Sequence, residues 1–362
     1  MNVDQKRLET LLQAMTRVGA SALHLVPGRA PQLRVQRRLV PGDESVVSAD
    51  DVTELIRDML FSDHRQRLAE CGQVEILYVT RGGCRYRATI AEVEATHSLV
   101  LRPLPSTPPK LDALDLPDQV GAFARARNGL VVVAGFFGSG KSTTIAALVG
   151  ALNEDAARHV VTIEDSIEFV HPPGNALLHQ REVGVHVATA ADGIRQAVVM
   201  GIDTLVVSEL HNAATLEAAI TAVEAGCLVI CGVEAGSIVG ALSELVLQVP
   251  LEDRARLRAR LARVLRGVMA QNLLQRSHRP GRVAVVEILV ANAAARTAIR
   301  TANFAELPNI MKRCRGLGMQ TADIALRGLL AAHLISQEEA LIHATDRDQV
   351  IVARTPAQPA GR

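Results

Sequence analysis

The sequence has no tryptophan, and its six phenylalanines and two tyrosines make up only 2% of the 362 residues. A buried core must therefore be built from aliphatic side chains, and hydrophobic residues as a whole reach 48%. Few aromatic rings also means few platforms on which single-stranded nucleic acid could stack its bases. The length is sufficient for two domains of ordinary size.

The sequence also lacks an excess of charge of either sign. Its 39 Lys and Arg residues balance 38 Asp and Glu residues, which leaves a formal net charge of +1. Such a chain has no bulk field to attract nucleic acid or an anionic membrane. The arginine-rich stretch 254–266 would favour a nucleic-acid motor, but we interpret it as a solvated helix face. We therefore expect no nucleic-acid partner.

Long hydrophobic runs and a disulfide pattern are absent as well. No window reaches the 18 consecutive apolar residues of a membrane-spanning helix. Residues 1–13 mix charges of both signs where a signal peptide would be apolar. The five cysteines are odd in number, and we expect small buried side chains in a reducing compartment. The sequence thus predicts a cytoplasmic protein.

The first part of the chain, residues 1–104, has the pattern of a small α+β domain. Apolar residues recur at helical spacing in residues 8–18, and shorter alternating runs predict strands. The expected elements are helices at 8–18 and 51–70 and strands at 22–25, 33–35, 74–80, 85–90 and 98–102.

Five prolines between Pro103 and Pro117 predict an extended linker over residues 105–118. Strand and helix patterns then alternate through residues 119–354, which predicts an α/β domain with a mostly parallel sheet and helices on both faces. The tail 355–362 is too polar and proline-rich to fold. The expected strands are 129–134, 159–163, 204–207, 228–233 and 283–290, and the expected helices are 141–152, 191–199, 213–225, 251–274 and at least three more.

The strongest chemical signal is the stretch Gly-Phe-Phe-Gly-Ser-Gly-Lys-Ser-Thr between a predicted strand and a predicted helix. It satisfies the phosphate-binding pattern G-x-x-x-x-G-K-[ST], in which glycines let the backbone N–H groups face the phosphates. Lys141 then reaches the β and γ oxygens, and Ser142 supplies a hydroxyl to Mg²⁺. Two phenylalanines are unusual here, and either a core anchor or a functional role would explain them. The residues are Gly135, Phe136, Phe137, Gly138, Ser139, Gly140, Lys141, Ser142 and Thr143.

Acidic residues follow two of the predicted strands. Glu164, Asp165 and Glu168 come after the strand at 159–163, where one of them could position water or serve only as a cap or solvated turn. Glu209 ends the strand at 204–207, which is the place of the acid that holds the Mg²⁺ shell in phosphate-binding-loop enzymes.

Together these motifs resemble the retraction ATPases of type IV pili, the PilT family within the type II/IV secretion ATPases. The resemblance extends from about residue 8 to residue 344. It rests on residues 135–143, TIEDSIEFVH at 162–171, HQREVG at 179–184, GLGMQTADIALRGLLAAHLIS at 316–336, GASALHL at 19–25, RYRATI at 85–90 and ARTAIR at 295–300.

The resemblance implies a PAS-like domain followed by a RecA-like ATPase domain, assembled as a homo- or mixed hexamer with ATP between subunits and Mg²⁺ as cofactor. It implies a motor docked on an inner-membrane platform protein, at the cytoplasmic face of that membrane. In the family's pattern Glu168 is the glutamate that activates water, and Glu209 is the acid of the third strand. Arg85, Arg87 and Arg102 fall near the arginines that reach a neighbour's γ-phosphate.

Several positions depart from the family's pattern. Cys227 and Glu234 replace the two residues of the histidine box, and His211 replaces an arginine after Glu209. Ala22 replaces an aspartate near the N-terminus. A carboxylate at Glu234 adds like charge near a triphosphate, so we expect ATP binding with slow or partner-dependent hydrolysis.

Two functions remain open from the sequence. The first is an ATP-driven motor of a pilus or a type II secretion-like machine, and the intact Lys141, Glu168 and Glu209 favour it. The second is a weakened, nucleotide-binding regulatory subunit that acts beside a fuller paralogue, and the altered histidine box favours that.

Overall fold

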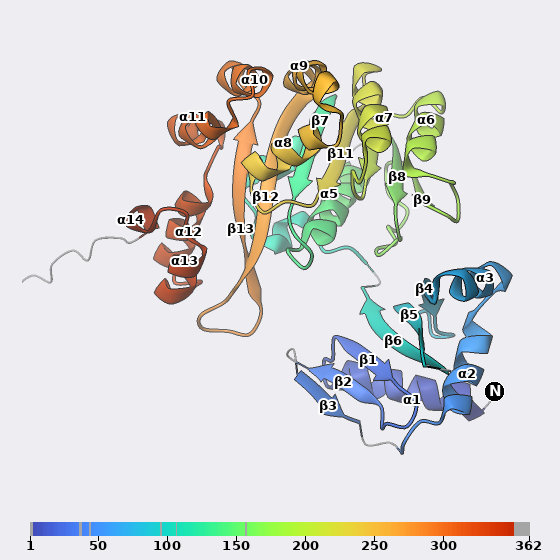
Figure 1. Cartoon of the computed structure of the whole chain (residues 1–362). Helices are drawn as coiled ribbons and strands as arrows, with labels where there is room; N and C mark the ends of the chain where they lie inside the picture. Colours follow the sequence, from blue (N-terminus) through green and yellow to red (C-terminus); the bar gives the residue numbers. More distant parts are fainter. Residues whose placement is uncertain are drawn as a thin grey trace, which may run out of the picture. The chain divides into compact units, whose positions relative to one another are not determined.

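A computed structural model of the chain describes residues 3–35, 38–42, 45–94, 96–105, 107–155 and 158–350. The chain divides into two compact units, Met1–Thr107 and Pro108–Arg362 (Figure 1). Within the described ranges, no helix is both long and apolar enough to cross a bilayer. The tail 355–362, for which we predict no fold, lies outside the described residues.

The first unit is an antiparallel sheet with three helices. The strands have the order β3-β2-β1-β6-β5-β4, and alternate residues of the longer strands are buried against the helices. The elements are α1 (Val3–Arg17), β1 (Ala22–Leu25), β2 (Gln32–Val35), β3 (Arg38–Pro41), α2 (Ala49–Met59), α3 (Ser62–Cys71), β4 (Gln73–Val79), β5 (Arg85–Val93) and β6 (Thr96–Leu104). The strands that the sequence predicts are confirmed, whereas β3 is not predicted.

The single helix predicted at 51–70 is wrong. The structure has two helices, because Leu60 adopts an extended backbone and buries its side chain in the core. A new helix then starts after Phe61, whose backbone N–H donates to Nδ1 of His64 at 3.4 Å. A helical apolar spacing that continues across such a break gives no sequence signal for it.

The second unit is built on a sheet of seven strands in the order β13-β12-β7-β11-β10-β8-β9. Every neighbouring pair is parallel except β12 and β13, so the predicted α/β fold is confirmed. The strands are β7 (Gly129–Ala134), β8 (His159–Glu164), β9 (Leu177–Glu182), β10 (Thr204–Val207), β11 (Leu228–Val233), β12 (Leu265–Gln275) and β13 (Arg282–Val290).

Helices cover both faces of this sheet (Figure 1). Alternate residues of β7 enter two separate cores, Val131 and Val133 with α4 and α5, and Leu130 and Val132 with α6 to α11. Helices α12 to α14 form a further core with the far ends of β12 and β13. The helices are α4 (Asp118–Ala124), α5 (Lys141–Asp155), α6 (Ala190–Val199), α7 (Ala213–Glu224), α8 (Ile238–Leu247), α9 (Arg254–Val264), α10 (Ala293–Arg300), α11 (Leu307–Arg313), α12 (Ala322–Ala331), α13 (Gln337–His343) and α14 (Arg347–Val350).

The long helix predicted at 251–274 is wrong. Helix α9 ends at Val264, and β12 begins at Leu265. Strand β12 lies between β7 and β13, and its residues 267–271 are all buried. A strand that is buried on both faces shows no alternation, so periodicity cannot distinguish it from a buried helix.

The linker predicted over residues 105–118 is not extended throughout. Leu111–Leu114 forms a short 3-10 helix that packs against α5. The five prolines flank this stretch without entering it, so its backbone N–H groups remain available for a turn.

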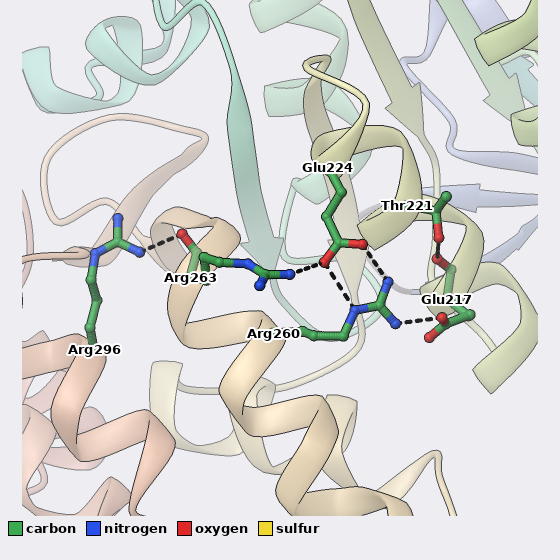
Figure 2. A network of polar contacts seen from close by, with 6 residues as sticks. All are labelled: Glu217, Thr221, Glu224, Arg260, Arg263 and Arg296. Carbon is green, nitrogen blue, oxygen red and sulfur yellow. Dashed lines mark hydrogen bonds and ion pairs between the residues drawn. The ribbon is translucent and has the colours of Figure 1, made fainter.

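The arginines of α9 are not simply a solvated face, as Figure 2 shows. Arg260 pairs with Glu217 and, at 2.8 Å, with Glu224 of α7, and its side chain is only 15% exposed. Arg263 also pairs with Glu224, at 2.5 Å, while Arg296 of α10 donates to the Arg263 carbonyl at 2.8 Å. Hydrogen bonds from Arg260 lower the pKa of Glu224. These contacts join α7, α9 and α10.

We expect Arg260→Ala to lower the free energy of unfolding by about 1 to 2 kcal/mol, because two carboxylates lose a shielded cation. Urea unfolding at neutral pH measures the change. The matched control is Arg256→Ala, which removes an exposed arginine of the same helix and should change stability by less than about 0.5 kcal/mol. Equal losses in the two variants would contradict the importance of these ion pairs.

Candidate functional site

The phosphate-binding pattern lies where β7 ends and α5 begins. Gly138 and Gly140 have φ values of +80° and +86°, a backbone region that favours glycine. A side chain at Gly135 would also be excluded, since its Cβ would lie 2.1 Å from Oγ of Ser139. The loop therefore has the turns and the close packing that let successive N–H groups face one ligand.

The two phenylalanines of this loop do not anchor it in the core. Phe137 is 91% exposed and Phe136 is 55% exposed. The Phe136 ring lies over Gly236, where an added Cβ would come within 2.6 Å of it. The core-anchor explanation is therefore wrong, and the loop itself presents two exposed aromatic rings.

Lys141 and Glu209 form an ion pair at the carboxyl edge of the sheet. Their side chains are only 12% and 14% exposed, and Oε1 of Glu209 is buried with no hydrogen-bond partner in the structure. Ser142, in the first turn of α5, is exposed. The structure thus brings the predicted lysine and the predicted third-strand acid into contact.

These residues fit a nucleotide with Mg²⁺. The glycine turns provide donors for phosphate, while the Ser142 hydroxyl and the unpartnered oxygen of Glu209 are the oxygen ligands that Mg²⁺ prefers. Across the described ranges, no group of three or more His, Cys, Asp and Glu side chains could hold a metal by itself. Such a site would use one or two protein oxygens together with phosphate and water.

The acids at the end of β8 lie beside β9: Glu164 is the last residue of β8, and Asp165 and Glu168 belong to the loop that follows it. Glu164 is half-buried, and this desolvation raises its pKa, with Glu168 and Glu182 as further negative neighbours. Nε2 of Gln180 donates to Oε1 of Glu164 at 3.0 Å, and the backbone N–H of Ile167 donates to Glu182 at 2.9 Å. The HQREVG motif therefore holds the acidic loop in place, and Glu168 lies half-buried within that loop.

Asp165 links the loop after β8 to the loop after β10. The Ser208 hydroxyl donates to Oδ2 of Asp165 at 2.9 Å, and Nε2 of His211 lies 3.0 Å from the same oxygen. The sequence resemblance implies an arginine at the position of His211. The contact of His211 with Asp165 carries a positive charge only when the imidazole is protonated.

The two replaced histidine-box positions lie at opposite ends of β11. Cys227 precedes the strand and is buried, with a pKa that burial raises, whereas Glu234 follows the strand and is exposed. A strand of six residues separates them by about 20 Å. Only Glu234 is therefore at the edge of the sheet that carries the phosphate-binding loop.

The three arginines predicted to act on a neighbouring subunit share one face of the first unit. Arg85 and Arg87 are two residues apart on β5, so their side chains lie on the same face of the sheet. Arg102 of β6 lies directly opposite Arg87. Nε of Arg87 pairs with Glu75 at 2.9 Å. Their action across a subunit boundary stays a prediction.

Sequence reasoning missed two side chains at the loop, Gln271 of β12 and Arg282 of β13. Gln271 donates to the carbonyl oxygen of Ser139 at 2.9 Å, and Arg282 donates to that of Gly138 at 3.1 Å. The two side chains follow their partners in the loop by 132 and 144 residues. One signal for Gln271 is present in the sequence, which is an amide side chain within the apolar stretch 264–274. The prediction of a helix over that stretch hid its position on a strand beside the loop.

Comparisons with known proteins decide the family. A family model described as "Type II/IV secretion system protein" matches residues 67–338. The chain belongs to this family. The resemblance that the motifs predict is thus confirmed.

Individual relatives agree with this assignment. The chain is 33% identical over 314 residues to the uncharacterized protein YggR of Escherichia coli. This match covers 87% of the chain and 95% of YggR. It is 32% identical over 330 residues to the type IV pilus retraction ATPase PilT of Pseudomonas aeruginosa, covering 91% and 96%.

A solved structure supports the same fold. A crystal structure of the pilus retraction motor PilT with bound ADP superposes with a TM-score of 0.85 at 30% identity, over 94% of this chain and 97% of that one. The predicted RecA-like fold of this family's ATPase domain is therefore confirmed.

Proposed function

We propose that this protein is an ATP-driven motor of a type IV pilus or a related secretion machine. The observation that carries this proposal is the ion pair of Lys141 with Glu209 beside an intact glycine loop, in a chain whose relatives include a pilus retraction ATPase. The alternative, a non-catalytic ring subunit, is not favoured, because Lys141, Glu168 and Glu209 are intact and the relatives include a pilus retraction ATPase.

Each residue of the site has a role in this proposal. The N–H groups around Gly138 and Gly140 and the Lys141 ammonium bind the β- and γ-phosphates. Glu209 and Ser142 hold Mg²⁺, which when bound neutralises charge between the phosphates. Glu168 orients water and accepts its proton, and the loop that Gln180 and Glu182 support keeps it in place.

The larger assembly belongs to the same proposal. A ring of six copies, or of copies mixed with a paralogue, would place Arg85, Arg87 and Arg102 of one subunit toward the nucleotide of its neighbour. The ring would dock on a membrane platform protein at the cytoplasmic face of the inner membrane. The balanced net charge supports a protein partner over nucleic acid.

We expect Glu234→His to raise the rate of phosphate release about tenfold, because it removes a like charge worth about 1.4 kcal/mol beside the phosphates. Steady-state phosphate release with Mg-ATP measures the change. The matched control is Glu244→His, which changes another exposed acid, on the adjacent α8, and should leave the rate unchanged.

Glu168→Gln completes this experiment, since it should stop hydrolysis while nucleotide binding persists. A wild-type protein that binds ATP without releasing phosphate, and that gains turnover from Glu234→His, would support the regulatory ring subunit. Turnover that Glu168→Gln does not reduce would contradict the proposed base.

A further inference from the structure

We propose that Gln271 is a positioning residue that holds the phosphate-binding loop in its ligand-ready form. The inference rests on the proposed function and adds a side chain that acts on the loop without touching phosphate. The juxtaposition that carries it is a buried amide of β12 bonded to the loop on one side and to helix α5 on the other.

The strand pairing explains why this residue meets the loop. Strand β12 runs parallel to β7, and Ala270 is the partner of Ala134, the last residue of β7. There β7 turns into the loop, whereas β12 continues to Gln275. Gln271 is therefore the first residue of β12 that has the loop, instead of β7, on this side, while its other side still pairs with Val286 of β13.

Both ends of the Gln271 amide are bonded. Nε2 donates to the carbonyl oxygen of Ser139 at 2.9 Å, and Oε1 accepts from the hydroxyl of Thr144 at 2.8 Å. Gln271, Ser139 and Thr144 are 3%, 5% and 1% exposed, so water cannot replace these bonds at low cost. The two hydrogen bonds thus fix the orientation of the amide, and the amide joins the loop to α5.

The bond to Ser139 controls which way the loop's peptide groups face. A loop that binds phosphate must direct N–H groups toward the ligand and carbonyl groups away from it. Gln271 holds the Ser139 carbonyl away, and Arg282 holds the preceding carbonyl, that of Gly138. Rotation of these peptides is thereby opposed before nucleotide arrives, which lowers the entropy cost of binding.

Contact with Gly140 strengthens the same restraint. A Cβ on Gly140 would lie 2.8 Å from Nε2 of Gln271, so the amide packs directly against this α-carbon. Gly140 has a φ of +86° and precedes Lys141. The position of the lysine therefore depends on the same side chain.

A purely structural role would predict a different outcome from mutation. If the amide only satisfied buried groups, its loss would lower stability and leave the affinity for nucleotide unchanged. If it positions the loop, the affinity must fall as well. A control variant that loses a comparable hydrogen bond from a buried side chain far from the loop separates the structural role from the positioning role.

Asn153 provides this control. It lies at the other end of α5, is 4% exposed, and donates from Nδ2 to the carbonyl oxygen of Pro172 at 2.7 Å. Gln271→Glu and Asn153→Asp each replace the amide of a buried residue by a carboxyl group where that amide donates to a backbone carbonyl. Gln271→Met, of similar length and without hydrogen-bonding groups, is the second variant if the carboxylate prevents folding.

The experiment measures the Kd for Mg-ADP by calorimetry, the melting temperature without nucleotide, and the KM and kcat for ATP. We expect the melting temperature to fall in both amide-to-acid variants, whereas only Gln271→Glu or Gln271→Met raises the Kd, by about tenfold. The KM for ATP should rise with it, with kcat retained at saturating ATP.

Unchanged Kd and KM in both Gln271 variants, with wild-type protein binding Mg-ADP, would overturn the positioning role alone. A rise in Kd for Asn153→Asp as large as that for the Gln271 variants would also overturn it. Wild-type protein that fails to bind Mg-ADP would instead overturn the proposed function, and the positioning role with it.

Discussion

Replacing Lys141 by alanine is expected to abolish phosphate release and also to lower the free energy of unfolding by about 2 to 3 kcal/mol. The first effect follows from the loss of the cation that binds the β- and γ-phosphates. The second follows because the Glu209 side chain, which is 14% exposed, loses the one partner it has among the described residues. The expected loss of unfolding free energy is smaller than for a fully buried ion pair, because both side chains retain some contact with water.

The double variant Lys141→Ala/Glu209→Gln separates the two effects. A neutral amide needs no cation, so this variant should recover most of the lost stability while phosphate release stays absent. Urea unfolding and phosphate release measured on the same preparations test this. If the single and double variants are equally stable, the ion pair does not contribute in the way proposed.

Glu287→Ala is expected to cost about 3 kcal/mol of stability and to lower the melting temperature by roughly 6 to 12 °C. Glu287 of β13 accepts from the backbone N–H of Ile238 at 2.9 Å and from that of Ala322 at 3.3 Å. These are the first residues of α8 and α12, so one carboxyl group caps two helices. Its removal leaves both N–H groups without this acceptor in a partly buried site. Calorimetry measures the melting temperature.

We expect Glu287→Ala also to affect the edge of the sheet that carries the phosphate-binding loop. Helix α8 directly follows the loop that carries Glu234 and Gly236, and Gly236 supports the Phe136 ring. We therefore expect Glu287→Ala to weaken nucleotide binding in addition to stability. Glu244→Ala, an exposed acid of α8, is the control, and it should change neither quantity. Equal effects in the two variants would contradict the capping role.

The pH dependence of stability gives an independent test of Glu287. Burial raises its pKa in the folded protein, so the folded state holds this proton at pH values where the unfolded chain, with a pKa of about 4.3, releases it. The contribution is complete below the unfolded pKa and declines as pH rises to the folded value. The difference in unfolding free energy between wild type and Glu287→Gln should therefore decline over that window.

The sequence predicts those parts of the site that are local in the chain. The loop 135–143, the strand before it and the helix after it follow from contiguous residues, because glycine turns and apolar runs act within a few positions. Glu209 could be placed beside Lys141 for the same reason, since both follow parallel strands that end at one edge.

The remaining parts depend on contacts between distant segments. Gln271 and Glu287 have partners 132 and 49 residues away, and no periodicity in the sequence encodes such contacts. The edge strand β9 was missed because its residues Leu-Leu-His-Gln-Arg-Glu are mostly polar and partly exposed. The break at Leu60 was missed because burial of one side chain decides it.

The distance between Ser139 and Gln271 along the chain has a consequence for biosynthesis. Translation at about 5 to 20 residues per second delivers Gln271 roughly 7 to 26 seconds after Ser139, a separation of 132 residues. During that interval the loop lacks the strand that fixes it, although its own residues are all present. Contacts between residues so far apart in the sequence also slow folding. A nascent chain that stops before β12 lacks Gln271, so we expect that nucleotide does not stabilise it.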